Sequence, residues 1–235
     1  MNFQKIILLL ACIILFSDCK DVVFNNPLDP DASRDALRVL KVMDTTIAGA
    51  GDLAFDGEKL WRVSESGRLY ALDMETGLVI RSLLTEGTSG VAFLQNIIYL
   101  SSDTNRMWAI EPLSGDPLTQ ISTVELVPRF LAALDLDLLV FDSRSNGFFR
   151  YNPEQGDREF LFKVSGMAAG GIASFKGGVL VTETTTDSVY HFTLGGDLVS
   201  AYRSPASGIC GVTVDYRDNI YLLTTDGAIY KVSLP

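Results

Sequence analysis

Residues 51–77 read GDLAFDGEKLWRVSESGRLYALDMETG. This stretch contains three short apolar runs, GDLAF, KLWRV and RLYALD, separated by the polar segments DGE and SESG. Runs of five or six residues that are rich in aliphatic and aromatic side chains and bounded by turn formers are typical of β-strands. The stretch therefore predicts three strands joined by tight turns.

The same pattern recurs along the chain. The third run reappears as RMWAIE, GFFRYN, SVYHFT and AIYKV, with a large aromatic residue in one slot: Tyr70, Trp108, Phe149, Tyr190 and Tyr230. Successive aromatics are therefore 38, 41, 41 and 40 residues apart. The first run reappears as GVAF, GIASF and GVTV, whereas the third copy reads RFLAA and begins at Arg129. A fourth run, such as LVIRSL, follows each of the first four aromatic runs.

Four short strands in about 40 residues are typical of one blade of a β-propeller. A single four-stranded sheet cannot bury both faces by itself, but neighbouring blades packed around an axis cover them. The sequence predicts an all-β, five-bladed propeller over residues 36–235. The fifth copy ends at Pro235 without a fourth strand, so ALRVLKVM, residues 36–43, is expected to supply it. The alternative for ASRDALRVLKVM is a short helix capped by Ser33.

The pattern G-x-x-F-D-G-x-x-L-W … G-x-L-Y-x-L-D-x-x-T-G resembles propellers of the NHL, YncE-like and glutamine-cyclotransferase-like kinds. The resemblance covers residues 37–235 and rests mainly on structural residues. The cyclotransferase-like group is also five-bladed, and the resemblance to it implies an enzyme of that kind. The Glu-Gly-Trp segment associated with active members of the group does not occur in this sequence.

The first 35 residues read as a leader and a tether. Lys5 precedes an apolar run of eleven residues, 6–16, which is too short to span a bilayer but suits a signal peptide. LFSDCK, ending just past Cys19, resembles a bacterial lipoprotein signal, which predicts a signal peptide at 1–18, lipidation of Cys19 and a tether at 19–35. LLAC, ending at Cys12, fits the lipoprotein motif better but leaves an exposed apolar stub. Simple secretion and an uncleaved anchor remain alternatives.

Composition narrows the classes of partner. The chain carries 29 acidic and 19 basic residues, a net charge of −10, which disfavours nucleic acid as a partner.

After lipidation of Cys19 only Cys210 remains as a thiol in the folded part, and we expect it to be a small buried side chain. His191 is the one histidine, so a structural role is expected and a zinc site is not. No cofactor is expected, with Ca²⁺ as the one ion to consider.

Candidate ligand-binding residues gather at the expected mouth of the central channel. The inner strands are expected to begin there at Ala50, Ser89, Arg129, Gly170 and Cys210. Each neighbouring turn between second and third strands contains a carboxylate: Glu65, Asp103, Asp142, Glu183 and Asp226. With Arg129, these side chains could bind a hard cation or the polar groups of a peptide or sugar. Alternatively, they are ordinary acidic residues of exposed turns.

Two functional hypotheses follow. The first, which the sequence favours, is a non-enzymatic binding or scaffold module for a protein, peptide or glycan. Its expected location is the bacterial envelope, lipid-anchored at the outer membrane or cell surface, with a periplasmic or secreted location as alternatives. The second is a metal-dependent hydrolase, lactonase or glutamine-cyclotransferase-like enzyme that uses the mouth carboxylates.

Overall fold

The computed structural model of the chain describes residues 34–235. The predicted signal peptide, Cys19 and nearly all of the predicted tether lie outside the described residues. The described residues form 21 β-strands and no helix. Accordingly, no apolar helix long enough to cross a membrane occurs in this part of the chain.

Twenty of the strands form five four-stranded antiparallel sheets. Blade 1 contains β3 (Gly51–Phe55), β4 (Lys59–Ser64), β5 (Arg68–Asp73) and β6 (Val79–Leu84). Blade 2 contains β7 (Val91–Leu94), β8 (Ile97–Ser101), β9 (Arg106–Ile110) and β10 (Pro117–Ser122). Blade 3 contains β11 (Pro128–Leu134), β12 (Asp137–Asp142), β13 (Gly147–Tyr151) and β14 (Arg158–Lys163). Blade 4 contains β15 (Ala169–Phe175), β16 (Gly178–Glu183), β17 (Ser188–Thr193) and β18 (Leu198–Arg203). Blade 5 contains β19 (Ile209–Val214), β20 (Ile220–Thr224), β21 (Ala228–Ser233) and β2 (Arg38–Asp44).

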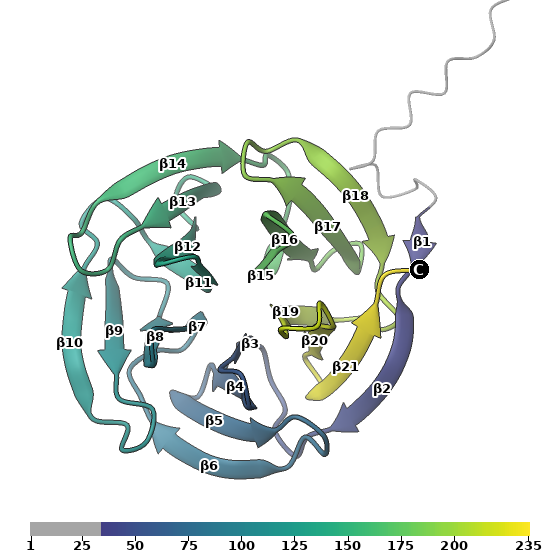
Figure 1. The fold of residues 1–235 in the computed structure, drawn as a ribbon, viewed down its shortest axis with the longest axis horizontal. Helices are drawn as coiled ribbons and strands as arrows, with labels where there is room; N and C mark the ends of the chain where they lie inside the picture. Colours follow the sequence, from purple (N-terminus) through teal and green to yellow (C-terminus); the bar gives the residue numbers. More distant parts are fainter. Residues whose placement is uncertain (1–33) are drawn as a thin grey trace, which may run out of the picture. The chain divides into compact units, whose positions relative to one another are not determined.

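The five sheets stand around a common axis (Figure 1). The inner strands β3, β7, β11, β15 and β19 surround the centre, and the outer strands β2, β6, β10, β14 and β18 form the rim. Residues 34–235 are a five-bladed β-propeller. The predicted fold class, blade number and four-stranded blade are therefore confirmed.

Five hydrophobic cores hold the ring together, one between each pair of neighbouring blades. The core between blades 3 and 4 contains Phe148 and Phe162, which stack with ring centroids 4.4 Å apart, and Tyr190 of the next blade. The core between blades 5 and 1 joins Met43 and Cys210 to Leu53. Burial of a large apolar side chain contributes roughly 1.5–3 kcal/mol, so each interface is held mainly by this packing.

The N-terminal strand closes the ring, as predicted, and the helical alternative is wrong. Strand β2 pairs antiparallel with β21, with Met43 opposite Ile229. A feature that the sequence did not predict precedes it: β1 (Asp35–Ala36) pairs in parallel with β18 of blade 4. The start of the described chain thus covers part of the outer edge of blade 4 before it completes blade 5.

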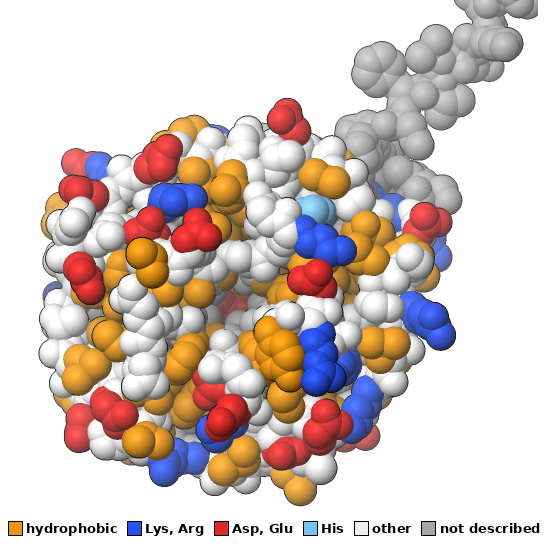
Figure 2. Space-filling view, viewed as in Figure 1, with side chains coloured by type: hydrophobic (Ala, Val, Ile, Leu, Met, Phe, Trp, Pro, Cys, Tyr) orange, Lys and Arg blue, Asp and Glu red, His pale blue; other side chains and the backbone are white. Residues whose placement is uncertain are grey.

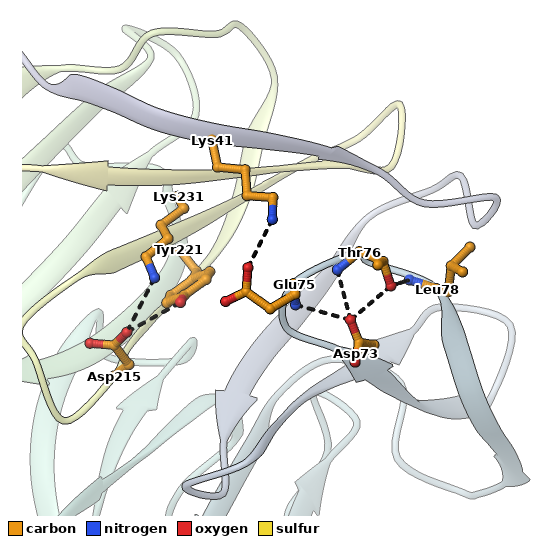
Figure 3. Close-up of polar contacts among 8 residues, drawn as sticks. All are labelled: Lys41, Asp73, Glu75, Thr76, Leu78, Asp215, Tyr221 and Lys231. Carbon is orange, nitrogen blue, oxygen red and sulfur yellow. Dashed lines mark hydrogen bonds and ion pairs between the residues drawn. The ribbon is translucent and has the colours of Figure 1, made fainter.

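Polar contacts supplement the packing where blade 5 meets blade 1 (Figure 3). Lys41 on β2 lies 2.9 Å from Glu75, which belongs to the turn after β5 in blade 1. Within that turn, Asp73 accepts a hydrogen bond of 2.7 Å from the Thr76 N–H. Because Lys41 and Glu75 are both exposed, we expect the ion pair to orient the closing strand rather than to stabilise it strongly.

Candidate functional site

A cavity of about 570 Å³ lies where the inner strands begin. All five blades line it, through Gly51, Ser89, Arg129, Gly170 and Cys210 at the inner strands and through the turns between second and third strands. Its volume falls within the range of small-molecule sites. We call this space the mouth cavity. Its position agrees with the mouth expected from the sequence, and in blade 1 both Ala50 and Gly51 line it.

β-Bulges shape three of the five blades at the mouth. In β11, β15 and β19 the ladder skips one residue: Arg129, Gly170 and Cys210, respectively. A bulge changes the direction in which a side chain points, and bulges occur often beside functional sites. The bulge in β11 accounts for the presence of the charged Arg129 side chain in the cavity wall.

Three of the six predicted residues line the mouth cavity: Glu65, Asp103 and Arg129. Asp103 accepts a hydrogen bond of 2.5 Å from the Ser143 hydroxyl, which links blades 2 and 3. Within residues 34–235, neither Glu65 nor Arg129 forms an ion pair or a side-chain hydrogen bond. The Arg129 guanidinium lies 5.3 Å from the centroid of the Phe130 ring. The Glu65 carboxyl and the Arg129 guanidinium are therefore available to bind a ligand.

The other three predicted carboxylates do not line the cavity, because each stabilises its own turn. Asp142 accepts hydrogen bonds from the Val127 N–H at 2.5 Å and the Ser145 N–H at 2.9 Å. Glu183 accepts them from the N–H groups of Thr186 at 2.7 Å and Thr185 at 3.1 Å. This arrangement is the usual way in which acidic side chains cap turns.

The third of these carboxylates, Asp226, accepts hydrogen bonds from the Thr224 hydroxyl and from the Ala228 N–H. The bond from Thr224 lowers the pKa of Asp226. Burial acts to raise the pKa of Glu183, but the hydrogen bonds from Thr186 and Thr185 outweigh burial and lower it. These carboxyls therefore stay ionised at neutral pH while serving the turns. Ligand binding by any of the six residues remains a prediction.

Cys210 and His191 occupy the environments that the sequence suggested. Cys210 is 6% exposed in the core between blades 5 and 1, and burial raises the pKa of its thiol to about 11. His191 packs edge-on against Phe175, and burial lowers its pKa. The described residues contain no group of three or more His, Cys, Asp or Glu side chains placed to hold a metal ion.

Sequence reasoning missed two fully buried charged residues of blade 1. Asp52 lies on the inner strand and Arg62 on the second strand, and neither is exposed to solvent. The Arg62 guanidinium donates to the carbonyls of Ile47 at 2.5 Å and Gly49 at 2.7 Å. Arg62 thereby fixes the segment that leads from the closing strand to the mouth.

A signal for both residues was present in the repeats. GDLAF contains one residue more than GVAF between the glycine and the shared aliphatic-Ala-Phe, and that residue is Asp52. Arg62 occupies a slot that is Leu100 in blade 2 and Val181 in blade 4, since all three pair with the repeated aromatic of their blade. A charged residue in a repeat position that is otherwise apolar marks a blade with a special environment.

Charged side chains of both signs are distributed over the face of the propeller that contains the axis. Figure 2 shows acidic, basic and apolar side chains interspersed around a hollow near the centre, without a continuous basic surface on that face of the described residues. Recognition of a phosphate backbone depends on such a surface. The view therefore gives no support to a nucleic-acid partner.

Comparison with known proteins identifies the fold but no family. No family model matches the sequence, and no curated protein matches it. Among solved structures, the glutaminyl cyclase of Myxococcus xanthus is similar, with 12% identity, a TM-score of 0.69 and coverage of 86% of this chain and 97% of that one. A streptogramin B lyase gives 13% identity, a TM-score of 0.52 and coverage of 83% and 97%. The WD40 repeats of RRP9 show 10% identity and a TM-score of 0.53, with coverage of 77% of this chain and 79% of that one. At these identities the similarity establishes the propeller fold alone.

Proposed function

We propose that the chain is a binding module that holds a polar segment of a peptide or glycan in the mouth cavity. The observation that carries the proposal is the convergence of all five blades on about 570 Å³ of space that includes Glu65, Asp103 and Arg129. A cavity of this size with a few convergent polar groups is the usual form of a ligand site. The hydroxyls of Ser89 and Ser102 in the same wall suit hydrogen bonding to a polar ligand.

Binding is favoured over catalysis by the state of the remaining reactive groups. Asp142, Glu183 and Asp226 already accept hydrogen bonds from their turns. The Cys210 thiol, with its pKa near 11, keeps its proton at neutral pH and is a poor nucleophile. The charged groups that face the cavity can orient a ligand, whereas an activated nucleophile would need an adjacent base.

The binding test compares the full chain with two triple variants. E65Q/D103N/R129Q removes the charges of the mouth, and E154Q/D116N/R38Q removes the same charges from exposed positions elsewhere. Each protein is applied to immobilised panels of peptides and glycans. We expect ligands of one class to bind the wild type and the control variant and to lose at least about tenfold in affinity for the mouth variant. Equal binding by all three proteins would contradict the proposal.

The metal-dependent enzyme makes a different prediction for the same chain. A Ca²⁺ ion bound only to the folded state raises the melting temperature, and a chelator lowers it again. A binding module without a resident metal shows no shift in either condition. A reproducible shift that disappears in E65Q/D103N/R129Q would favour the enzyme hypothesis.

The envelope location is proposed from residues 1–35 alone. A lipid-modified Cys19 would tether the propeller to a membrane through acyl chains, which need no basic surface. The test is metabolic labelling of the full chain with a fatty acid in a bacterial host. The label should be lost in C19S and retained in C12S. Labelling of C19S, or no labelling of the wild type, would contradict lipidation at Cys19.

A further inference from the structure

Asp52 occupies the level of the channel just inside the mouth cavity. Leu53 pairs with Arg62, which pairs with the repeated aromatic Tyr70. Val91 stands in the same relation to the aromatic of blade 2. Asp52 is therefore equivalent to the residue that precedes Val91, and the corresponding residues are Gly90, Phe130, Gly171 and Gly211. Three of the other blades thus carry no side chain at this level.

These glycines leave the space that the Asp52 side chain fills. A Cβ atom on Gly171 would lie 3.1 Å from Asp52 Oδ1, and one on Gly211 would lie 3.0 Å from Asp52 Cα. Gly51, on one side of Asp52, lines the mouth cavity, and Leu53, on the other, lines a smaller cavity of about 90 Å³. Asp52 therefore lies between two residues that line different cavities, and its own side chain is buried among the inner strands.

Backbone N–H groups of four blades are directed at this carboxyl. The Leu53 N–H donates to Oδ1 at 2.9 Å. The N–H groups of Val91, Leu131 and Val212, which are equivalent to Leu53, also favour the charged form of Asp52. They do not reach full hydrogen-bond geometry, and Oδ2 has no hydrogen-bond partner within residues 34–235. The carboxyl contacts several inner strands, yet its hydrogen bonding is incomplete.

No cationic side chain of residues 34–235 compensates a charge at this position. The ionisable side chains on strands around β3 are Lys59 and Arg62 on β4, Arg129 on β11, Cys210 on β19 and Tyr221 on β20; β7 and β15 carry none. Within the described residues, none of these side chains forms an ion pair or hydrogen bond with Asp52. Burial therefore dominates and raises the pKa of Asp52 well above its usual range, against the smaller opposing effect of the N–H groups.

We propose that Asp52 is a proton-operated switch on the propeller axis. With its proton, the neutral carboxyl packs between the inner strands and keeps the floor of the mouth cavity closed. Without it, a buried and unpaired charge favours separation of the inner strands, because separation lets water reach the carboxylate. A rise in pH through the folded-state pKa of Asp52 thus loosens the ring from its centre, beneath the mouth cavity.

The first test measures unfolding in urea between pH 4 and pH 9. A carboxyl with a raised pKa binds more protons in the folded state than in the unfolded state. Stability contributed by its proton is therefore lost as pH rises from about 3.9 through the folded pKa. The unfolding equilibrium constant should increase by up to about tenfold per pH unit in this range relative to D52N. The control D116N, at an exposed aspartate, should follow the wild type. Parallel curves for wild type and D52N would overturn the proposal.

The second test uses the unmodified chain and so does not depend on folding of D52N. Hydrogen exchange is followed by NMR at the amides of Val91, Leu131 and Val212, with Leu139 and Val181 in the second strands as references. After correction for intrinsic exchange, protection of the first group should fall by up to about tenfold per pH unit relative to the references. Constant relative protection overturns the switch even if the urea curves differ, since the charge would then be accommodated without movement.

Discussion

Replacement of Gly171 by alanine should destabilise the propeller by bringing two inner strands into collision. The new Cβ would lie 2.7 Å from Gly211 Cα and 2.9 Å from Val212 N, both backbone atoms of blade 5. Favourable carbon contacts are about 3.5–4.0 Å, so the strands must separate by roughly 0.5–1 Å. No side-chain rotation can relieve contacts with backbone atoms.

The magnitude follows from two opposing effects. Overpacking of this kind costs roughly 1–3 kcal/mol. Loss of unfolded-state freedom on changing Gly to Ala offsets about 0.4–1 kcal/mol of that cost. We therefore expect a net loss of about 1–2 kcal/mol, which lowers the melting temperature of a domain of this size by roughly 2–8 °C.

A matched control lies in the same blade. A Cβ on Gly195 would have Thr193 Oγ1 at 3.6 Å and Asp197 Oδ2 at 4.0 Å as its nearest neighbours, which are ordinary contacts. G195A should therefore be as stable as the wild type or slightly more stable. Thermal and urea unfolding of the full chain, followed by far-ultraviolet circular dichroism, compares the variants. The close approach of the inner strands is refuted if G171A is as stable as G195A.

Three further predictions concern packing, thiol chemistry and ring closure. Phe148 is fully buried, so F148A should lower the free energy of unfolding by about 3–5 kcal/mol. The control L113A, at a side chain that is 74% exposed, should change the free energy of unfolding little. Equal urea midpoints for the two variants would contradict the aromatic core. The second prediction uses a variant in which all cysteines except Cys210 are serine. Because burial raises the pKa of Cys210 to about 11, a thiol reagent at pH 8 should label the folded chain at least about 100-fold more slowly than the chain unfolded in urea. Comparable labelling rates would show that the thiol is accessible and ionised. Because Lys41 and Glu75 are both exposed, K41A and E75A should leave the urea midpoint unchanged, and a clear drop in either would show that the pair fastens the closing strand.

The blades themselves were predictable because each is local in sequence. Strands within a blade are joined by short turns, so alternating apolar residues and turn formers specify them. The aromatic residue Tyr70 and its four equivalents in the repeats indicated that there are five blades. Even the closing strand followed from arithmetic, because the last copy lacked a fourth strand before Pro235.

The site was less predictable because it is assembled from five blades. Turn position alone grouped Asp142 with Asp103, yet Asp142 bonds to its own turn and Asp103 faces the mouth cavity. The difference arises from register: Asp142 is the last residue of β12, whereas Asp103 lies within the turn after β8. A shift of one position along a strand reverses the face to which a side chain points.

The sequence alone specified the number and order of the twenty blade strands, since most of their pairings join residues that are close in the chain, whereas the pairing of β1 with β18 was not predictable from it. The tertiary structure alone decided that Asp52 lies on the axis and that bulges aim Arg129 into the mouth cavity. Residues from successive blades meet at the axis although about 40 positions separate them, and small shifts in pairing select which ones meet. The local hydrophobic pattern specifies each blade, whereas the set of residues that meet at the axis depends on the strand-pairing registers of all five blades together.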